Sequence, residues 1–196
     1  MTAQPKVDLA FHAAGRTLPI DHGYGLYGAL CRLLPAHHEA SDLAMGLVRG
    51  RYVGNGLLDL TPHTELVLRL PAGRIRAYLP LAGKTLEVDG HRLRLGVPQT
   101  RALVPAATLY AHLVTTRNGH DPARFADEIR RQADGIGVRG RLTVGERRTF
   151  GVHGKQVVGY SVLASELTAE ESIALQEHGL GGRRKMGGGF FETRDA

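Results

Sequence analysis

Hydrophobic residues in the first half of the chain change their spacing along the sequence, and each spacing predicts one element. Residues 7–11 alternate between apolar and polar or small side chains, as in a half-buried strand. In 23–34 apolar residues recur three and four apart, which predicts a helix that Pro35 ends. Asp89-Gly90 between alternating hydrophobic residues is a strong hairpin signal. The same interpretation predicts the other elements of this half: strands over 43–48 and 64–70, a helix over 71–81 and a hairpin over 84–95.

The second half repeats this order of elements. A strand is expected over 108–116, and Asp121 followed by a proline predicts a capped helix. A capping box beginning at Thr168 predicts the second helix. The remaining predicted elements are a hairpin over 142–163 and a short final strand that carries Phe190 and Phe191. Two consecutive βαββαβ units predict an α+β chain of two tandem ferredoxin-like (RRM-like) domains. We expect them over 1–98 and 108–196, joined by a linker over 99–107.

The predicted helix over 23–34 presents one apolar face. That face carries Tyr24, Tyr27, Leu30, Cys31 and Leu34. Cys31 is the only cysteine of the chain, so a disulfide framework and a thiolate zinc site are both excluded. Within an apolar run, this cysteine is expected to be a small core residue.

Charge narrows the class of partner. The 196 residues carry a formal net charge of +6, which favours an anionic partner, either nucleic acid or a membrane surface. Charge alone is equally compatible with a basic protein that has no such partner. No stretch approaches the roughly 20 apolar residues of a membrane helix, and the amino terminus does not resemble a signal peptide. We therefore expect a cytoplasmic protein with no membrane partner.

A glycine-rich segment lies between the last predicted helix and the last predicted strand. It contains six glycines and three cations: Gly179, Gly181, Gly182, Arg183, Arg184, Lys185, Gly187, Gly188 and Gly189. Glycine lets backbone amides approach an anion closely, and cations attract phosphates. The alternative is a flexible, solvated loop with a basic tip. The segment matches neither the Walker loop nor the dinucleotide fingerprint, because it carries no Gly-Lys-Ser/Thr and leads from a helix into a strand.

These motifs together resemble a known family. The repeated βαββαβ pattern and the sequence HGLGGRRKMGGGFF are similar to the CRISPR-associated precursor-RNA endoribonucleases, the Cas-six family of the RAMP superfamily. DHGYGLYGALCRLLPAHHE resembles the first helix of its myxococcal-type branch, and TLYAHLV and LQEHGLGG fit the same family. The resemblance implies an enzyme that cuts CRISPR repeats by attack of the RNA 2′-hydroxyl, leaving a 2′,3′-cyclic phosphate and a 5′-hydroxyl. It also implies a repeat RNA partner, often a hairpin, and other Cas proteins of an effector complex.

Histidines around the first helix are the candidates for the chemistry. Imidazole suits both proton removal and proton donation near neutral pH. The resemblance places a catalytic histidine just after this helix, where His37-His38 stands; we take His38 first and leave His37 open. It also implies an assisting tyrosine within the helix, which Tyr24 matches. The third role is open among His22, Arg49 and Arg51. No set of side chains has convincing metal-ligand spacing, so we expect no metal and no cofactor.

Two other functions fit parts of the pattern. A non-cleaving RAMP subunit that coats guide RNA would share the fold and the glycine-rich segment, but would not need the histidine and tyrosine group. A tandem RRM protein needs an aromatic motif on its third strand, which neither half carries. Further basic residues are secondary RNA-binding candidates: Arg130, Arg131, Arg139, Arg141, Arg147 and Arg148.

Overall fold

The chain forms two compact units in the computed structural model, which describes residues 4–193. The boundary between the units lies between Ala102 and Leu103. Each unit has its own hydrophobic core. No helix within the described residues is both long and apolar enough to cross a membrane.

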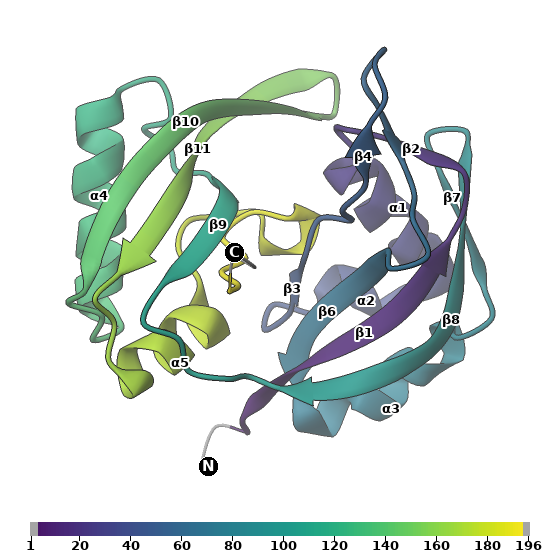
Figure 1. Cartoon of the computed structure of the whole chain (residues 1–196), viewed down its shortest axis with the longest axis horizontal. Coiled ribbons are helices and arrows are strands. Elements are labelled where there is room, and N and C mark those ends of the chain that lie inside the picture. The colour runs from purple at the N-terminus through teal and green to yellow at the C-terminus, as the bar shows by residue number, and fades with distance from the viewer. Residues whose placement is uncertain (1–3, 194–196) are drawn as a thin grey trace. The chain divides into compact units, whose positions relative to one another are not determined.

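The N-terminal unit is built on a five-stranded antiparallel sheet. Its elements are β1 (Lys6–Ala14), β2 (Thr17–Pro19), α1 (Gly23–Leu33), α2 (Ala36–Glu39), β3 (Ala44–Met45), β4 (Arg51–Tyr52), β5 (Leu57–Asp59), β6 (Glu65–Pro71), η1 (Ala72–Arg74), α3 (Ile75–Tyr78), η2 (Leu79–Leu81), β7 (Thr85–Val88) and β8 (His91–Ala102). The strand order is β3-β6-β1-β8-β7, with β1 in the centre (Figure 1). Strands β3, β6, β1 and β8 have the ferredoxin-like arrangement, and β7 is added at the edge as half of a hairpin.

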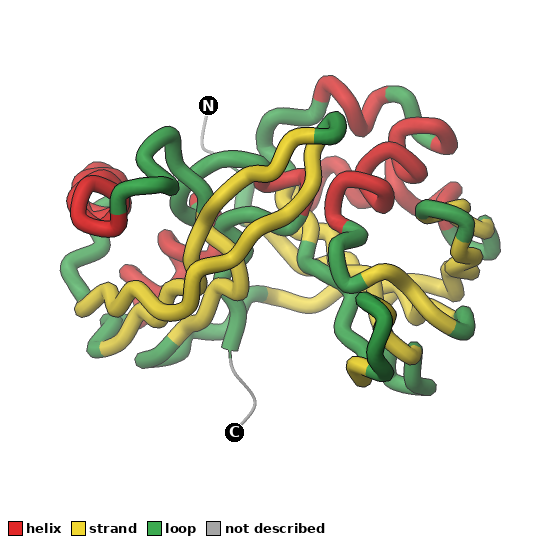
Figure 2. Tube along the Cα trace, turned by 90° about the horizontal axis from the view of Figure 1, so that it is seen from above, coloured by secondary structure: helices red, strands yellow, loops and turns green. Residues whose placement is uncertain are grey.

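Helices cover one face of this sheet. The unit at the right of Figure 2 shows its helices gathered on one side of the strands. Alternate residues of β1, such as Leu9 and Phe11, are buried on that side and pack with Leu26 and Leu30 of α1. Asp89 and Gly90 have positive φ angles of 48° and 83°, as the two-residue turn between β7 and β8 requires.

Three details of the N-terminal unit differ from expectation. The helix expected over 71–81 is divided into η1, α3 and η2, because Gly73 and Pro80 are unfavourable in a helix interior. The linker expected over 99–107 begins inside β8, which stays paired with β1 as far as Ala102. A small second sheet, in the order β2-β5-β4, was not expected.

The buried face of α1 is also not the expected one. The buried residues of the helix are Gly23, Leu26, Ala29 and Leu30. Tyr24, Tyr27 and Cys31 are only half-buried, so their stripe borders the core instead of filling it. Two tyrosines and a cysteine are thereby left partly accessible along the side of the helix.

The C-terminal unit repeats the topology with a smaller sheet. Its elements are β9 (Leu109–Val114), α4 (Pro122–Gly135), β10 (Arg141–Val152), β11 (Lys155–Ser165), α5 (Ala169–His178) and η3 (Arg184–Met186). The strand order is β10-β11-β9. Both predicted helix starts are confirmed: the Asp121 side chain accepts from the amides of Ala123 and Arg124, and Thr168 and Glu171 form a capping box. The core includes Phe125 of α4.

The final strand of this unit is reduced to one bridge. Phe190 and Phe191 are buried but lie outside any strand, and only Glu192 pairs, with Tyr110 of β9. The expectation of a final strand at the two phenylalanines is therefore wrong. The tandem ferredoxin-like fold is confirmed, with its last strand occupied largely by the glycine-rich segment.

Candidate functional site

A histidine and a tyrosine meet at the end of the first helix. Leu34 and Pro35 turn the chain from α1 into α2, where His38 is exposed to solvent. Its Nδ1 atom lies 2.7 Å from the Tyr27 hydroxyl oxygen, which is hydrogen-bond distance. The two ring centroids are 6.2 Å apart. The turn after α1 thus places the exposed His38 imidazole so that its Nδ1 atom contacts Tyr27.

Tyr27 remains protonated at neutral pH. Burial, followed by its hydrogen bond to the Cys31 thiol and the nearby Tyr24, raises the pKa of Tyr27 to about 12. The oxygen of a protonated phenol can accept a hydrogen bond from Nδ1–H of His38, while its own O–H donates to another acceptor. The hydroxyl therefore suits the task of orienting the imidazole without taking its proton.

His37 lies in a different environment from its neighbour. Its side chain is fully buried, and its Nδ1 atom is 3.2 Å from the Tyr78 hydroxyl. Its ring also packs 5.7 Å from that of Tyr27. His37 thus packs against Tyr27 from the protein interior, whereas His38 is the histidine of the pair that is accessible from solvent.

His22 has a structural environment. It is 1% exposed, its Nδ1 atom lies 2.8 Å from the Pro19 carbonyl, and its Nε2 accepts from the Val48 amide at 3.0 Å. Burial lowers the pKa of His22, so the ring is neutral at neutral pH. Both ring nitrogens of His22 thus bind backbone groups. These contacts favour a structural role for His22 over the catalytic role considered from the sequence.

The other residues expected at this site differ in burial and in their partners. Tyr24 is half-buried on the stripe of α1 that also carries Tyr27. Arg51 is exposed and forms an ion pair of 3.2 Å with Asp59, while Arg49 is exposed just before β4. The sequence did not single out Tyr27 as a partner of His38, although its position one turn after Tyr24 on the same stripe was a usable signal.

The glycine-rich segment is hydrogen-bonded mainly to other parts of its unit. Five of its glycine amides donate to other groups of the protein: Gly179 to the Leu175 carbonyl, Gly181 to the Gln132 side chain, Gly182 to the Thr115 carbonyl, Gly188 to the Arg183 carbonyl and Gly189 to the Leu113 carbonyl. The expectation that these amides point together at an anion is wrong, because they already have acceptors within the unit.

Close packing explains the glycines of this segment. Gly181 and Gly189 have φ angles of 74° and 63°, and a Cβ atom on either would collide with a backbone carbonyl oxygen. A Cβ on Gly188 would likewise collide with the Gly182 carbonyl oxygen. Gly187, with φ of 90°, ends the short η3 turn. The glycines therefore shape the loop, and binding is left to the side chains that the loop exposes.

Arg183 is the most accessible cation of the segment. It is exposed at a left-handed position with φ of 59°, and its guanidinium carbon lies 6.0 Å from the centroid of the Phe150 ring. Arg184 and Lys185 are half-buried. A side-chain nitrogen of Arg184 donates to the Glu177 carbonyl at 3.4 Å, which connects the segment to the end of α5.

Most of the secondary basic candidates have acidic partners. Arg130 and Arg139 pair with Asp134, and the others that pair do so with carboxylates of their own neighbourhood: Arg131 with Glu128, Arg141 with Glu166 and Arg148 with Glu146. Of the six, Arg147 alone has no carboxylate partner in the part of the chain that the structure describes. Because neither has a carboxylate partner among the described residues, Arg147 and Arg183 are better suited to contact phosphate than the paired arginines.

Comparison with known proteins places this geometry in a family. Residues 7–195 match the family model described as Cas6 Crispr. The chain is 43% identical over 185 residues to the CRISPR-associated endonuclease Cas6 of Myxococcus xanthus (strain DK1622), covering 94% of this chain and 80% of that protein.

Solved structures share the fold. A CRISPR-associated protein Cas6 superposes with a TM-score of 0.63 at 9% identity, covering 97% of this chain and 99% of the other. A RAMP protein that binds different RNA substrates gives a TM-score of 0.62 at 13% identity, with the same coverage. From the family match over nearly the whole chain, together with the 43% identical relative, the chain belongs to the Cas6 family.

Proposed function

We propose that this protein is an endoribonuclease that cleaves the repeats of CRISPR precursor RNA to produce mature guide RNAs. Membership of the Cas6 family and 43% identity to a CRISPR-associated endonuclease support the class of activity. The observation that carries the proposal is the exposed His38 held at 2.7 Å by the Tyr27 hydroxyl. A subunit that only coated RNA would have no need of an oriented, accessible imidazole.

The proposed reaction uses the substrate's own 2′-hydroxyl as nucleophile. A base removes its proton, the oxygen attacks the adjacent phosphorus, and an acid protonates the departing 5′ oxygen. The products are a 2′,3′-cyclic phosphate and a 5′-hydroxyl. Within residues 4–193 no group of three or more His, Cys, Asp or Glu side chains lies together as a metal site would require. The proposed route relies on the 2′-hydroxyl and the imidazole, and it needs no metal ion.

His38 is the proposed proton carrier, with Nε2 facing the RNA. In the neutral ring, Nδ1–H donates to the Tyr27 oxygen and the lone pair on Nε2 accepts the 2′-hydroxyl proton. In the imidazolium form, the same Nδ1 contact remains and Nε2–H donates to the leaving oxygen. In both proposed roles the Tyr27 oxygen accepts from Nδ1–H. Tyr24 remains a second proposed assistant from the same helix.

The proposed substrate is repeat RNA, including hairpins. Arg183 and the other cations of the glycine-rich segment supply contacts to phosphate, and these contacts do not depend on base sequence. RNA duplexes are recognised mainly by shape and by backbone contacts, which suits such side chains. Other Cas proteins of an effector complex are further proposed partners.

End-group analysis of cleaved repeat RNA tests the proposal. The purified protein should cut the repeat in excess EDTA and leave a 2′,3′-cyclic phosphate. A matched RNA with a single 2′-deoxy sugar before the cut should bind equally well and remain intact. Cutting of the deoxy RNA would exclude the internal attack, and tight binding without any cutting would favour the coating subunit.

A further inference from the structure

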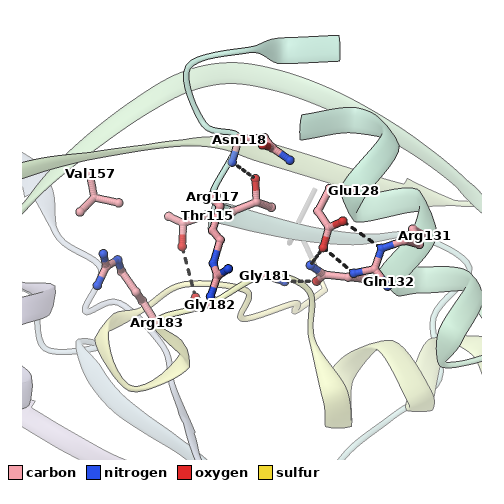
Figure 3. A pocket seen from close by; sticks show the side chains of 11 residues that line it. Thr115, Arg117, Asn118, Glu128, Arg131, Gln132, Val157, Gly181, Gly182 and Arg183 are labelled. Carbon is pink, nitrogen blue, oxygen red and sulfur yellow. Dashed lines mark hydrogen bonds and ion pairs between the residues drawn. The ribbon is translucent and has the colours of Figure 1, made fainter. Parts of the chain in front are cut away.

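A pocket of about 680 Å³ lies beside the glycine-rich segment, within the C-terminal unit (Figure 3). Four parts of the unit form it: the loop after β9, the second half of α4, Val157 of β11, and residues 181–183 of the glycine-rich segment. The lining residues that matter for recognition are Arg117, Asn118, Glu128, Gln132, Val157 and Arg183. The volume is in the range of pockets that hold small organic ligands, and far exceeds that of a phosphate ion.

Two cations of this pocket are available to an anion. Arg117 and Arg183 are both exposed, and neither has a carboxylate partner among residues 4–193. Arg131, the third arginine of the lining, is bound by Glu128 through two hydrogen bonds of 2.9 and 2.7 Å. The charge of that arginine is thus neutralised locally, and the uncompensated charge of the lining is +2. Guanidinium groups form strong, charge-assisted hydrogen bonds with phosphate oxygens.

Hydrogen bonds join the side chains of α4 that line the pocket. Glu128 accepts from the Gln132 side chain at 2.6 Å, and the Gln132 oxygen accepts from the Gly181 amide at 2.7 Å. The bonds from Arg131 and Gln132 lower the pKa of Glu128 to about 2, so the carboxylate is ionised at neutral pH. This network connects α4 to the glycine-rich segment and holds the wall in place before any ligand arrives.

We propose that this pocket binds one unpaired nucleotide of the repeat RNA, with its phosphate between Arg117 and Arg183. The base then lies toward Asn118 and the Glu128–Gln132 wall, with Val157 as the apolar contact. Carboxylate and carboxamide groups accept hydrogen bonds from the exocyclic amino groups of adenine, cytosine and guanine, which uracil lacks. Unpaired RNA bases are commonly recognised in this way. The inference rests on the proposed function for the identity of the ligand as RNA.

A scan with abasic RNA tests the pocket. The affinity of the parental protein is measured for a set of repeat RNAs that carry a single abasic nucleotide at successive positions and a 2′-deoxy sugar at the cut. One unpaired position should weaken binding about tenfold when its base is removed, and uridine at that position should weaken binding nearly as much. Arg117→Ala should weaken binding of intact and abasic RNA alike, because it removes a phosphate contact. Asn118→Ala should weaken binding of intact RNA and show a smaller further loss with the abasic RNA, because it removes a contact to the base.

Matched controls separate this result from a failure of the proposed function. Arg124→Ala, on α4 but outside the pocket, should bind every RNA as the parental protein does. Arg124→Ala should also cut the all-ribose repeat at the parental rate, because it leaves the pocket unchanged. The nucleotide pocket is excluded if no abasic position affects affinity, or if the full abasic effect persists in Asn118→Ala. Absence of cutting by the parental protein would instead contradict the proposed function.

Discussion

The two units share one order of strands and helices but fill the place of the fourth strand differently. In the N-terminal unit that place is held by β8, a strand of 12 residues that pairs with β1 on one side and β7 on the other. In the C-terminal unit it is held by the glycine-rich segment and the single bridge between Glu192 and Tyr110. One topology therefore accommodates a rigid sheet edge in one copy and a compact loop with exposed cations in the other.

The chemistry available to the two units differs in the same way. The N-terminal unit carries an oriented imidazole beside a phenol, groups that can move a proton. The accessible groups of the C-terminal loop and pocket are guanidiniums, which remain charged and hold anions. This contrast leads to the hypothesis that the N-terminal unit performs the chemistry and the C-terminal unit holds the RNA. The following variants test that division.

The largest expected effect is on the rate of cleavage. His38→Ala should slow single-turnover cutting by about 10²–10⁴-fold, because general acid–base groups typically contribute that much. Affinity for repeat RNA should change little. The neighbouring His37→Ala should instead lower the melting temperature, because it removes a fully buried ring. Parental cutting by His38→Ala would contradict the assignment.

Replacing the loop cations should affect binding and leave the chemistry intact. The triple variant Arg183→Ala, Arg184→Ala, Lys185→Ala should lose affinity on the order of 100-fold and flatten the salt dependence of binding. At saturating protein, cutting should continue at nearly the parental rate. Arg184→Ala alone serves as a control for the contact of this residue with the end of α5. An unchanged salt slope in the triple variant would favour the solvated-loop interpretation.

A structural role for His22 predicts a loss of stability. His22→Ala should cost about 2–4 kcal/mol, because it leaves a cavity and an unpaired Val48 amide. Since burial lowers the pKa of His22, the unfolded chain binds the proton more readily than the folded chain does. The free energy of unfolding should therefore fall as pH drops below about 6.5, and this part of the fall should vanish in the variant. Denaturant unfolding at pH 5.5 and 7.5 measures both.

The smallest expected effect separates the two tyrosines. Tyr27→Phe removes the hydroxyl that lies beside His38 and keeps the ring, so cleavage should slow by about 3–10-fold. Tyr24→Phe should have less effect. Single-turnover rates of the two variants, measured with binding, make the comparison. A larger loss in Tyr24→Phe would restore that residue to the assisting role.

Local sequence determined the order of elements and several of their ends. The Asp89-Gly90 turn, the Asp121 cap and the Thr168 capping box depend on residues a few positions apart, and the structure has all three. The repeated pattern of strands and helices was sufficient to predict the fold. The family resemblance of the sequence also predicts the turn after the first helix as the place of the chemistry, and this stays a prediction.

Tertiary structure decided which side chains can act. His37 and His38 are equivalent in sequence, but Tyr78, 41 residues away, contributes to the buried environment of the first. The rotation of α1 that exposes Tyr27 depends on how its leucines pack against the sheet. The Gln132–Gly181 bond likewise joins residues 49 positions apart and leaves the glycine amide no free proton for a ligand. Periodicity describes which residues share a helix face, whereas burial and hydrogen-bond partners depend on distant segments that only folding brings together.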